Sequence, residues 1–444
     1  MSSRLSAWLA RWSPVLPLLL AEGVIALGFG AILPILPLYY TAHGVDLPTL
    51  GVVVAAWPAA RLVGEPLLGR LADRTSRKWM MVVALAVSAV AIVLPLAFVG
   101  PTAFIGLRLL AGLAAAAYDP AARGYLMDMN PPERQGETFG LYSAAQIGGF
   151  MIGPAVGGIA AAVTGTPTVV FWVCGIAYAV SAVLVAVRVA DRPRLAVASA
   201  SVAAPTADDS TARRGADADA MMAESAEPGS APGGSTALPG TGRLLNRLLV
   251  VALVINVGAY LAGGTYEVIW SVYMTSLGAN IGLIGVSFFT FSLPVLLLSP
   301  FTGRFVDRRG GYVALVAGGI GVAAMGVAYP LVHSYWWMIA LGLIEGTAAA
   351  FSSPPLYVLV SRAAPTGRSS TAQGLFGAAG TVGTIAASIA TGYLAAIDLR
   401  LPFVVMGVAM FVLLMVGVAA GGRLLWAALQ PHPASLGAAL EPVA

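Results

Sequence analysis

The sequence has few charged residues, a single cysteine and a single lysine. Only 10% of its 444 residues are charged and 58% are hydrophobic, and the mean hydropathy is +0.85. A soluble domain of this size would need far more charge on its surface, so the composition indicates a polytopic membrane protein. With Cys174 alone, no disulfide can form within the chain. We expect no metal, cofactor or nucleic acid, because the histidines lie far apart in the sequence and no nucleic-acid-binding motif occurs.

Hydrophobic runs of membrane-spanning length fill most of the chain, and we expect twelve transmembrane helices. The first run is too long for the core of a signal peptide, so we interpret it as a retained helix. The predicted spans are 14–38, 48–68, 79–99, 103–126, 138–162, 168–189, 247–274, 282–302, 312–331, 336–360, 372–395 and 401–421.

The basic residues predict the orientation. Of the 24 basic residues, Arg61 and Arg108 fall inside spans and Arg400 falls in a loop on one side. The others lie at or near connections on the opposite side, which the positive-inside rule assigns to the cytoplasm. We therefore expect a multi-pass protein of the cell inner (plasma) membrane with both termini in the cytoplasm.

The spans divide into two sets of six around a polar segment. We expect an N-terminal bundle (1–189), a disordered cytoplasmic linker (190–246), a C-terminal bundle (247–421) and a cytoplasmic tail (422–444). The linker is rich in Ala, Ser, Pro and Gly and has almost no aromatic residues, so it cannot bury enough apolar surface to offset its ordering entropy.

A short polar turn occurs twice, once in each half. Residues 69–78 read GRLADRTSRK and residues 303–311 read GRFVDRRGG, so Gly303 and Asp307 follow Gly69 and Asp73 by the same 234 positions. Two such turns, each between apolar runs, indicate an internal duplication.

The first turn resembles the loop motif between helices 2 and 3 of the major facilitator superfamily of secondary transporters. Two more motifs are similar to those of that family. Arg108 and Gly112 match R-x-x-x-G in helix 4, and residues 149–158, GFMIGPAVGG, match the pattern associated with its 12-helix drug:proton antiporters. Its residues are Gly149, Gly153, Pro154, Gly157 and Gly158.

The resemblance implies an all-α fold of two pseudo-symmetric six-helix bundles. It also implies a cytoplasmic gate in which Gly69 and Asp73 dock against the other half in the outward-open state, and in which Arg77 pairs with Asp128. The second copy has Gly311 where Arg77 stands in the first. The expected gate residues are Gly69, Asp73, Arg74, Arg77, Asp128, Gly303, Asp307 and Arg308.

Five acidic residues fall inside the predicted spans, where each charge is costly unless it is paired, protonated or hydrated. Four of them lie on runs 1, 4, 7 and 10, which line the central cavity in the family. The candidate residues for proton coupling and substrate binding are Glu22, Arg108, Asp119, Glu267 and Glu345.

Depth and spacing assign different roles to these charges. Glu22 and Glu345 come nearest the midplane, where substrates and coupling ions bind in such transporters. A contact between Arg108 and Glu22 stays open, because their depths differ by on the order of 10 Å. Arg61 and Glu65, four apart on one helix face, are interpreted as a structural pair.

We predict a proton-coupled efflux antiporter of small lipophilic or cationic compounds such as drugs, working by alternating access as a monomer in the lipid bilayer, with H⁺ as the coupling ion. One alternative is a proton symporter or facilitator for a sugar or organic acid, although Asn and Gln are scarce in the spans. Another is a receptor or structural protein that does not transport. An enzyme is not expected, since no catalytic arrangement stands out.

Overall fold

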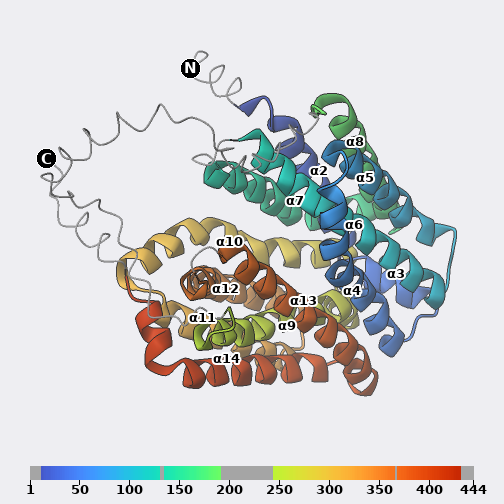
Figure 1. Ribbon diagram of the computed structural model, residues 1–444. Coiled ribbons are helices and arrows are strands. Elements are labelled where there is room, and N and C mark those ends of the chain that lie inside the picture. The colour runs from blue at the N-terminus through green and yellow to red at the C-terminus, as the bar shows by residue number, and fades with distance from the viewer. Residues whose placement is uncertain (1–11, 131–134, 192–243, 366–367, 432–444) are drawn as a thin grey trace, which may run out of the picture. The chain divides into compact units, whose positions relative to one another are not determined.

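The computed structural model describes residues 12–130, 135–191, 244–365 and 368–431. Every regular element in these ranges is a helix, and the fold is the predicted all-α polytopic one (Figure 1). Eleven of the described helices are long and apolar enough to cross a membrane, or twelve if the bent pair at the start counts as one span.

The described part of the first half contains seven helices and a short 3₁₀ turn, coloured blue to green in Figure 1. They are α2 (Leu16–Ile32), α3 (Leu36–Ala42), α4 (Leu47–Ala72), α5 (Arg77–Val93), η1 (Leu94–Leu96), α6 (Pro101–Met129), α7 (Gln135–Thr164) and α8 (Val169–Arg188).

Within residues 244–365 and 368–431, the second half contains six helices and one 3₁₀ turn, coloured yellow-green to red. They are α9 (Arg247–Ser276), α10 (Ile281–Arg309), α11 (Tyr312–Ala328), η3 (Tyr329–Leu331), α12 (Tyr335–Ala363), α13 (Ser369–Ile397) and α14 (Leu401–Ala428).

The two halves repeat the same structure. Helices α4 and α10 begin 234 positions apart, as do α6 and α12. The first pair of helices also share a cap, because Asp46 accepts a hydrogen bond from Thr49 N and Asn280 accepts one from Leu283 N. The duplication predicted from the polar turns therefore extends to helix boundaries and capping.

Packing within the halves follows the same repeat. In the first half α2 packs on α7 and α8, α4 packs on α6, and α5 packs on α6 and α8. In the second half α9 packs on α13 and α14, α10 packs on α12, and α11 packs on α12 and α14. Each half thus buries its own apolar core, and α4·α13 and α7·α10 are the main contacts between them.

The first span differs from the predicted continuous helix over 14–38. It is broken between α2 and α3, which are bent by 41°. Pro34 lies in the break, where its missing N–H and its ring prevent a regular helix from continuing. The corresponding α9 of the second half is unbroken, so the duplication is not exact here.

The end of the last predicted span can be compared with the structure, whereas most of the expected linker and the end of the expected tail cannot. Helix α14 continues past residue 421 to Ala428, with a local break at Gly422, whose φ is +48°. The expected linker lies almost wholly in residues 192–243, and the end of the expected tail in residues 432–444, both outside the described ranges. Linker disorder stays a prediction.

Candidate functional site

Two adjoining cavities lie between the helices. The first, of about 420 Å³, is lined mainly by α2, α4, α6 and α7, and the second, of about 500 Å³, is lined mainly by α9 to α13. Both linings are largely apolar, and five residues belong to both: Phe29, Trp57, Phe150, Phe291 and Ser292. The cavities therefore meet at a set of aromatic side chains contributed by both halves.

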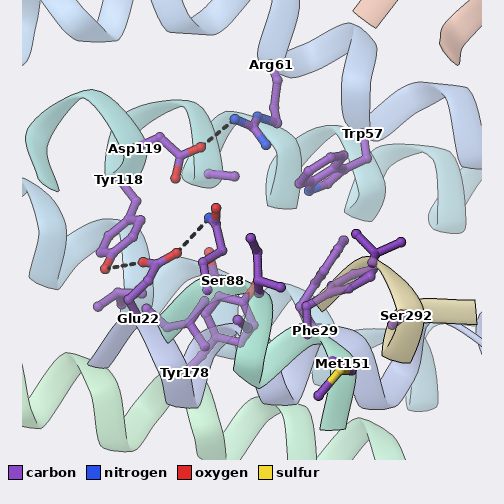
Figure 2. A pocket seen from close by; sticks show the side chains of 18 of the residues that line it. Glu22, Phe29, Trp57, Arg61, Ser88, Tyr118, Asp119, Met151, Tyr178 and Ser292 are labelled. Carbon is purple, nitrogen blue, oxygen red and sulfur yellow. Dashed lines mark hydrogen bonds and ion pairs between the residues drawn. The ribbon is translucent and has the colours of Figure 1, made fainter. Parts of the chain in front are cut away.

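Glu22 lines the first cavity from α2. Tyr118 Oη donates a hydrogen bond to Glu22 Oε2 over 3.0 Å, and Gln146 Nε2 donates one to Glu22 Oε1 over 2.8 Å (Figure 2). The residue is only 3% exposed, and it forms no ion pair with the basic side chains of the described ranges. A buried carboxyl held only by neutral donors can exchange a proton or a cation without first breaking a salt bridge.

Glu345 has the same environment in the other half. Tyr266 Oη donates to Glu345 Oε1 over 2.7 Å, and Tyr329 Oη donates to Glu345 Oε2 over 2.5 Å. Glu345 lines the second cavity and is 1% exposed. Within the described part of the chain it too lacks an ion pair. Each half thus places one carboxyl with two neutral donors beside its own cavity.

Arg61 has a larger role than the predicted structural pair with Glu65. That pair is present, with Arg61 Nη2 2.6 Å from Glu65 Oε1. The same guanidinium also forms an ion pair with Asp119, drawn in Figure 2, and lies over the Trp57 ring at 4.8 Å from its centroid. Arg61 also lines the first cavity, so the predicted pair with Glu65 is confirmed but is not its only described contact. Spacing along one helix could not reveal a partner on α6.

Arg108 pairs with Glu267, which settles the contact left open above. Its Nη2 lies 2.5 Å from Glu267 Oε1 and 3.3 Å from the Val54 carbonyl oxygen. Arg108 is 4% exposed, so this is a buried ion pair, and it joins α6 of the first half to α9 of the second. Glu22 is therefore not its partner.

The charges inside the spans do not balance. Two arginines face five acids: Arg61 holds Glu65 and Asp119, and Arg108 holds Glu267. Glu22 and Glu345 remain without a positive partner among the described side chains. The cavities therefore favour a proton or a positively charged ligand over an anion.

The first polar turn contains the expected contact between Arg77 and Asp128. Arg77 forms an ion pair with Asp128, donates to the Gly124 carbonyl oxygen, and lies 3.4 Å from Asp73. These contacts tie the turn to α6 of its own half. Contacts between the halves gather at the other end of the helices, where Gly51 of α4 packs on Gly392 of α13.

The second turn is held differently. Arg362 replaces Asp128 at the 234-residue offset, and its Nη1 donates to the carbonyl oxygens of Ala428 and Gln430 over 2.6 and 2.8 Å. Gly311, in place of Arg77, donates its backbone N–H to the Leu429 carbonyl oxygen over 2.7 Å. Here the turn is tied to the end of α14. The side chain of Asp307 is outside the described parts of the chain, and its gate role stays a prediction, as do those of Arg74, Gly303 and Arg308.

The gate that the family resemblance implies predicts that Asp73→Asn stops transport while ligand binding persists. Asp73 is 71% exposed in this conformation, so the variant should fold and bind normally. In the opposite conformation the turn would meet the other half, and the variant would lose charge-assisted hydrogen bonds of about 1.5–3 kcal/mol each. Vesicle transport and detergent binding measure the two effects. Asp46→Asn, which removes a charge at the other end of α4 and keeps an N-capping side chain, is the control, and parental transport by Asp73→Asn would contradict the gate.

The predicted antiporter motif lies between α2 and the second half. A Cβ at Gly149, Gly153 or Gly157 would collide with the backbone of α2. On the other side of the helix, Gly158 approaches Gly282 of α10, and a Cβ at Gly285 would collide with the Pro154 carbonyl. The small residues thus allow α7 to contact α2 and α10 closely at once.

Gly153→Ala is expected to destabilise the protein by about 1–3 kcal/mol, because its methyl group would overpack the α2–α7 interface. The new Cβ would meet Gly30 Cα at 2.8 Å. Gly148→Ala on the same helix is the matched control, since no heavy atom lies within 4 Å of its Cβ position. Thermal unfolding in detergent should show a lower Tm for the first variant alone. Equal melting temperatures would show that the close approach is not required.

Sequence reasoning missed several neighbours of the carboxyls. Tyr118, Tyr266 and Tyr329 were not among the candidate site residues. Gln146 was noticeable as one of very few amides inside the spans, and that rarity was the available signal for a role in the cavity. The tyrosines gave none, because tyrosine is common in spans and the partner carboxyls lie far away in the sequence.

Comparisons with known proteins identify the family of the chain. The model of the Major Facilitator Superfamily matches residues 18–266 and 248–435. The Quinolone resistance protein NorA of Staphylococcus aureus is 29% identical over 141 residues, and the Multidrug resistance protein 2 of Bacillus subtilis is 31% identical over 135. These alignments cover 32% and 30% of this chain and 36% and 34% of the relatives, so the chain matches about a third of their length.

Two solved structures share the fold. The nucleoside transporter NupG superposes with a TM-score of 0.69 at 14% identity, over 92% of this chain and 98% of its own. A bacterial homologue of the human lysosomal transporter Spinster, in an inward-facing and occupied conformation, also gives 0.69 at 14% identity, over 94% and 98%. At such low identity these similarities establish the fold alone.

Proposed function

The chain belongs to the Major Facilitator Superfamily, and we propose that this membrane transporter exports small lipophilic or cationic compounds, such as drugs, in exchange for protons. The observation that carries the proposal is the pair of buried carboxyls, Glu22 and Glu345, one beside each cavity and each without a basic partner among the described side chains. The relatives whose names refer to quinolone and multidrug resistance support a drug as the substrate.

The aromatic cavities suit lipophilic cations for two reasons. Ring faces attract a cation and also bury apolar surface, and Phe29, Trp57 and Phe291 supply such rings. Arg61, which lines the first cavity, is already paired with Glu65 and Asp119, so a substrate anion would have to displace a carboxylate there. Amide side chains, which a sugar site would favour, are limited to Gln146 and Asn256 in these linings.

Exchange follows from competition for the carboxyls. A cationic substrate stabilises the ionised carboxylate, whereas an incoming proton neutralises it and removes the attraction. Binding of one therefore favours release of the other, which is the thermodynamic requirement for antiport. We propose that Glu22 and Glu345 carry this exchange, that Arg108 and Glu267 close one end, and that no cofactor other than the coupled H⁺ is needed.

The proposed alternating access would use contacts between the halves that, among the described residues, gather at one end of the helices. The halves meet where α4 and α10 begin, whereas Gly69 at the other end of α4 contacts Pro120 of its own half. With the orientation proposed below, the side closed here is the outer one. The opposite state would break these contacts and bring the two polar turns together.

Proton-gradient-dependent uptake of dyes and antibiotics by everted membrane vesicles tests the proposal. We expect accumulation of lipophilic cations that collapses when a protonophore removes the gradient. Double Glu22→Gln/Glu345→Gln vesicles are the negative control. If the vesicles instead moved a sugar or organic acid in the opposite direction and transported no cation, the proposed export would be wrong and symport would explain the result.

The proposed orientation in the inner (plasma) membrane, with cytoplasmic termini, predicts which turns are labelled from outside. In a Cys174→Ala background, Thr166→Cys lies in the α7–α8 connection and Thr75→Cys in the first polar turn, and both positions are exposed. An impermeant thiol reagent should label the first in intact cells and the second only after permeabilisation. The reverse pattern would invert the topology.

We further propose that one chain is the transporting unit, because each chain contains both cavities and both carboxyls. Its partners are then a small-molecule substrate and the surrounding lipid.

A further inference from the structure

We propose that the two adjoining cavities together select elongated, lipophilic bis-cations, with one positive charge directed to Glu22 and the other to Glu345. This inference rests on the proposed export of cations and narrows it to a substrate class. It follows from the placement of the charges, from the aromatic side chains that the two cavity linings share, and from the pairing of every other charge in the cavities.

The first observation is that the unpaired carboxyls belong to different cavities. Glu22 lines only the first and Glu345 only the second. Each accepts hydrogen bonds from two neutral side chains, and neither forms an ion pair with a described basic residue. A ligand with one charge can compensate one of them and leaves the other buried without a counter-charge. A ligand with two charges can compensate both.

The second observation is that four of the five residues shared by the two cavity linings are aromatic. Phe29 stacks on Trp57 with a centroid distance of 5.3 Å, and Phe150 lies 6.3 Å from Phe29. Phe291 adds a ring from the second half, and its backbone packs directly against Gly346, the residue after Glu345. The middle of a ligand that reaches from one carboxyl to the other must therefore pass along ring surfaces, which favours an apolar or aromatic spacer.

The spacer length can be bounded. A cation binds within about 6 Å of a ring centroid, so charges on both sides of one ring are on the order of 10 Å apart. A two-carbon spacer is too short for this separation, whereas a ten-carbon chain can span it. The cavities, of about 420 and 500 Å³, each match the volume of one bulky cationic head group with part of a chain.

The third observation concerns the other charges. Asp119 and Glu267 also line the cavities, but each is bound to an arginine. A second positive charge placed there would have to displace a guanidinium, whereas at Glu22 or Glu345 it displaces only neutral donors or a proton. This difference assigns the two ligand charges to these two carboxyls rather than to any pair of cavity acids.

The test is equilibrium binding to the purified full chain in detergent, without a proton gradient. The probes are decane-1,10-diyl bis-quinolinium, the matched mono-cation 1-decylquinolinium, and the ethane-1,2-diyl bis-quinolinium. We expect the long bis-cation to bind at least about tenfold more tightly than the mono-cation, the equivalent of about 1.4 kcal/mol. The short bis-cation should show no such advantage.

Glu22→Gln and Glu345→Gln should each reduce the affinity of the long bis-cation to that of the mono-cation. Glu65→Gln removes a span charge that lies outside both cavity linings, and it should preserve the tenfold ratio. Equal binding of the long bis-cation and the mono-cation by the parent would overturn the inference and leave cation export standing. A ratio that survives in both glutamine variants would also overturn it.

The experiment separates this inference from the proposed function. If none of the three compounds binds, the proposal that the protein exports lipophilic cations is contradicted, and so is the inference that rests on it. If one glutamine variant does not fold, as judged by size-exclusion chromatography, the spacer comparison in the parent and the remaining variant still decide the question.

Discussion

Replacing both Glu22 and Glu345 with glutamine is expected to abolish concentrative efflux while downhill exchange of neutral substrate continues. Glutamine has nearly the same shape as a protonated glutamate but cannot release a proton, so the variant is fixed in the neutral form. Substrate and proton then no longer compete, and the coupling free energy falls to zero. The steady-state concentration ratio across everted vesicles should drop to about one, the value without coupling.

Transport by the two single variants shows whether the coupled proton is carried by the carboxyl of one half or by both carboxyls. If Glu22 alone carries it, Glu345→Gln should still concentrate a neutral substrate, and the converse holds for Glu22→Gln. Glu65→Gln is the charge-matched control, because Glu65 lies outside both cavity linings and Asp119 stays bound to Arg61. If the double variant still concentrates substrate, neither Glu22 nor Glu345 carries the coupled proton, and Asp119 and Glu267 remain as the candidates.

Arg108→Gln is expected to open the closed end of the protein and to reduce transport by more than tenfold. The ion pair with Glu267 joins the two halves, and removing one member of a buried pair costs about 3–5 kcal/mol in the state that contains it. Each 1.4 kcal/mol shifts the equilibrium between the two conformations by about tenfold. A transporter held in one conformation cannot complete the cycle.

Accessibility of an introduced cysteine measures that shift. Ser388→Cys lies on α13 next to Gly51 of α4, where the halves meet, and it is buried in this conformation. Its labelling rate by a thiol reagent should rise in Arg108→Gln. The charge-swapped Arg108→Glu/Glu267→Arg protein should restore slow labelling, since the attraction is re-formed in reverse. Unchanged labelling in the single variant would show that the ion pair does not hold this end closed.

Much of the fold could be predicted from the sequence, because its main determinants are local or periodic. Apolar runs identify spans, and the 234-residue offset between the polar turns revealed a duplication that extends to the helix boundaries. The bend in the first span was missed although Pro34 was visible. Proline is tolerated inside other helices of this chain, among them α4 with Pro58 and Pro66, so it does not by itself predict a break.

The candidate site was predictable in its charges but not in their pairing. The cost of burying a charge drew attention to Glu22 and Glu345, and the structure places each beside a cavity. The partners of Arg61 and Arg108 depend on which helices face each other and at what depth, within one bundle for Arg61 and between the two bundles for Arg108. An offset along a single helix gives neither, which is why Asp119 was missed as a partner of Arg61 and Glu267 as the partner of Arg108.

The most direct test of the account is substrate-induced proton release. Purified protein in weakly buffered detergent solution, with a pH-sensitive dye, receives a saturating lipophilic cation such as 1-decylquinolinium. The account predicts proton release by the parent, reduced release by Glu22→Gln or Glu345→Gln, and none by the double variant that still folds. Undiminished release by the double variant would contradict the claim that these two carboxyls exchange protons for substrate.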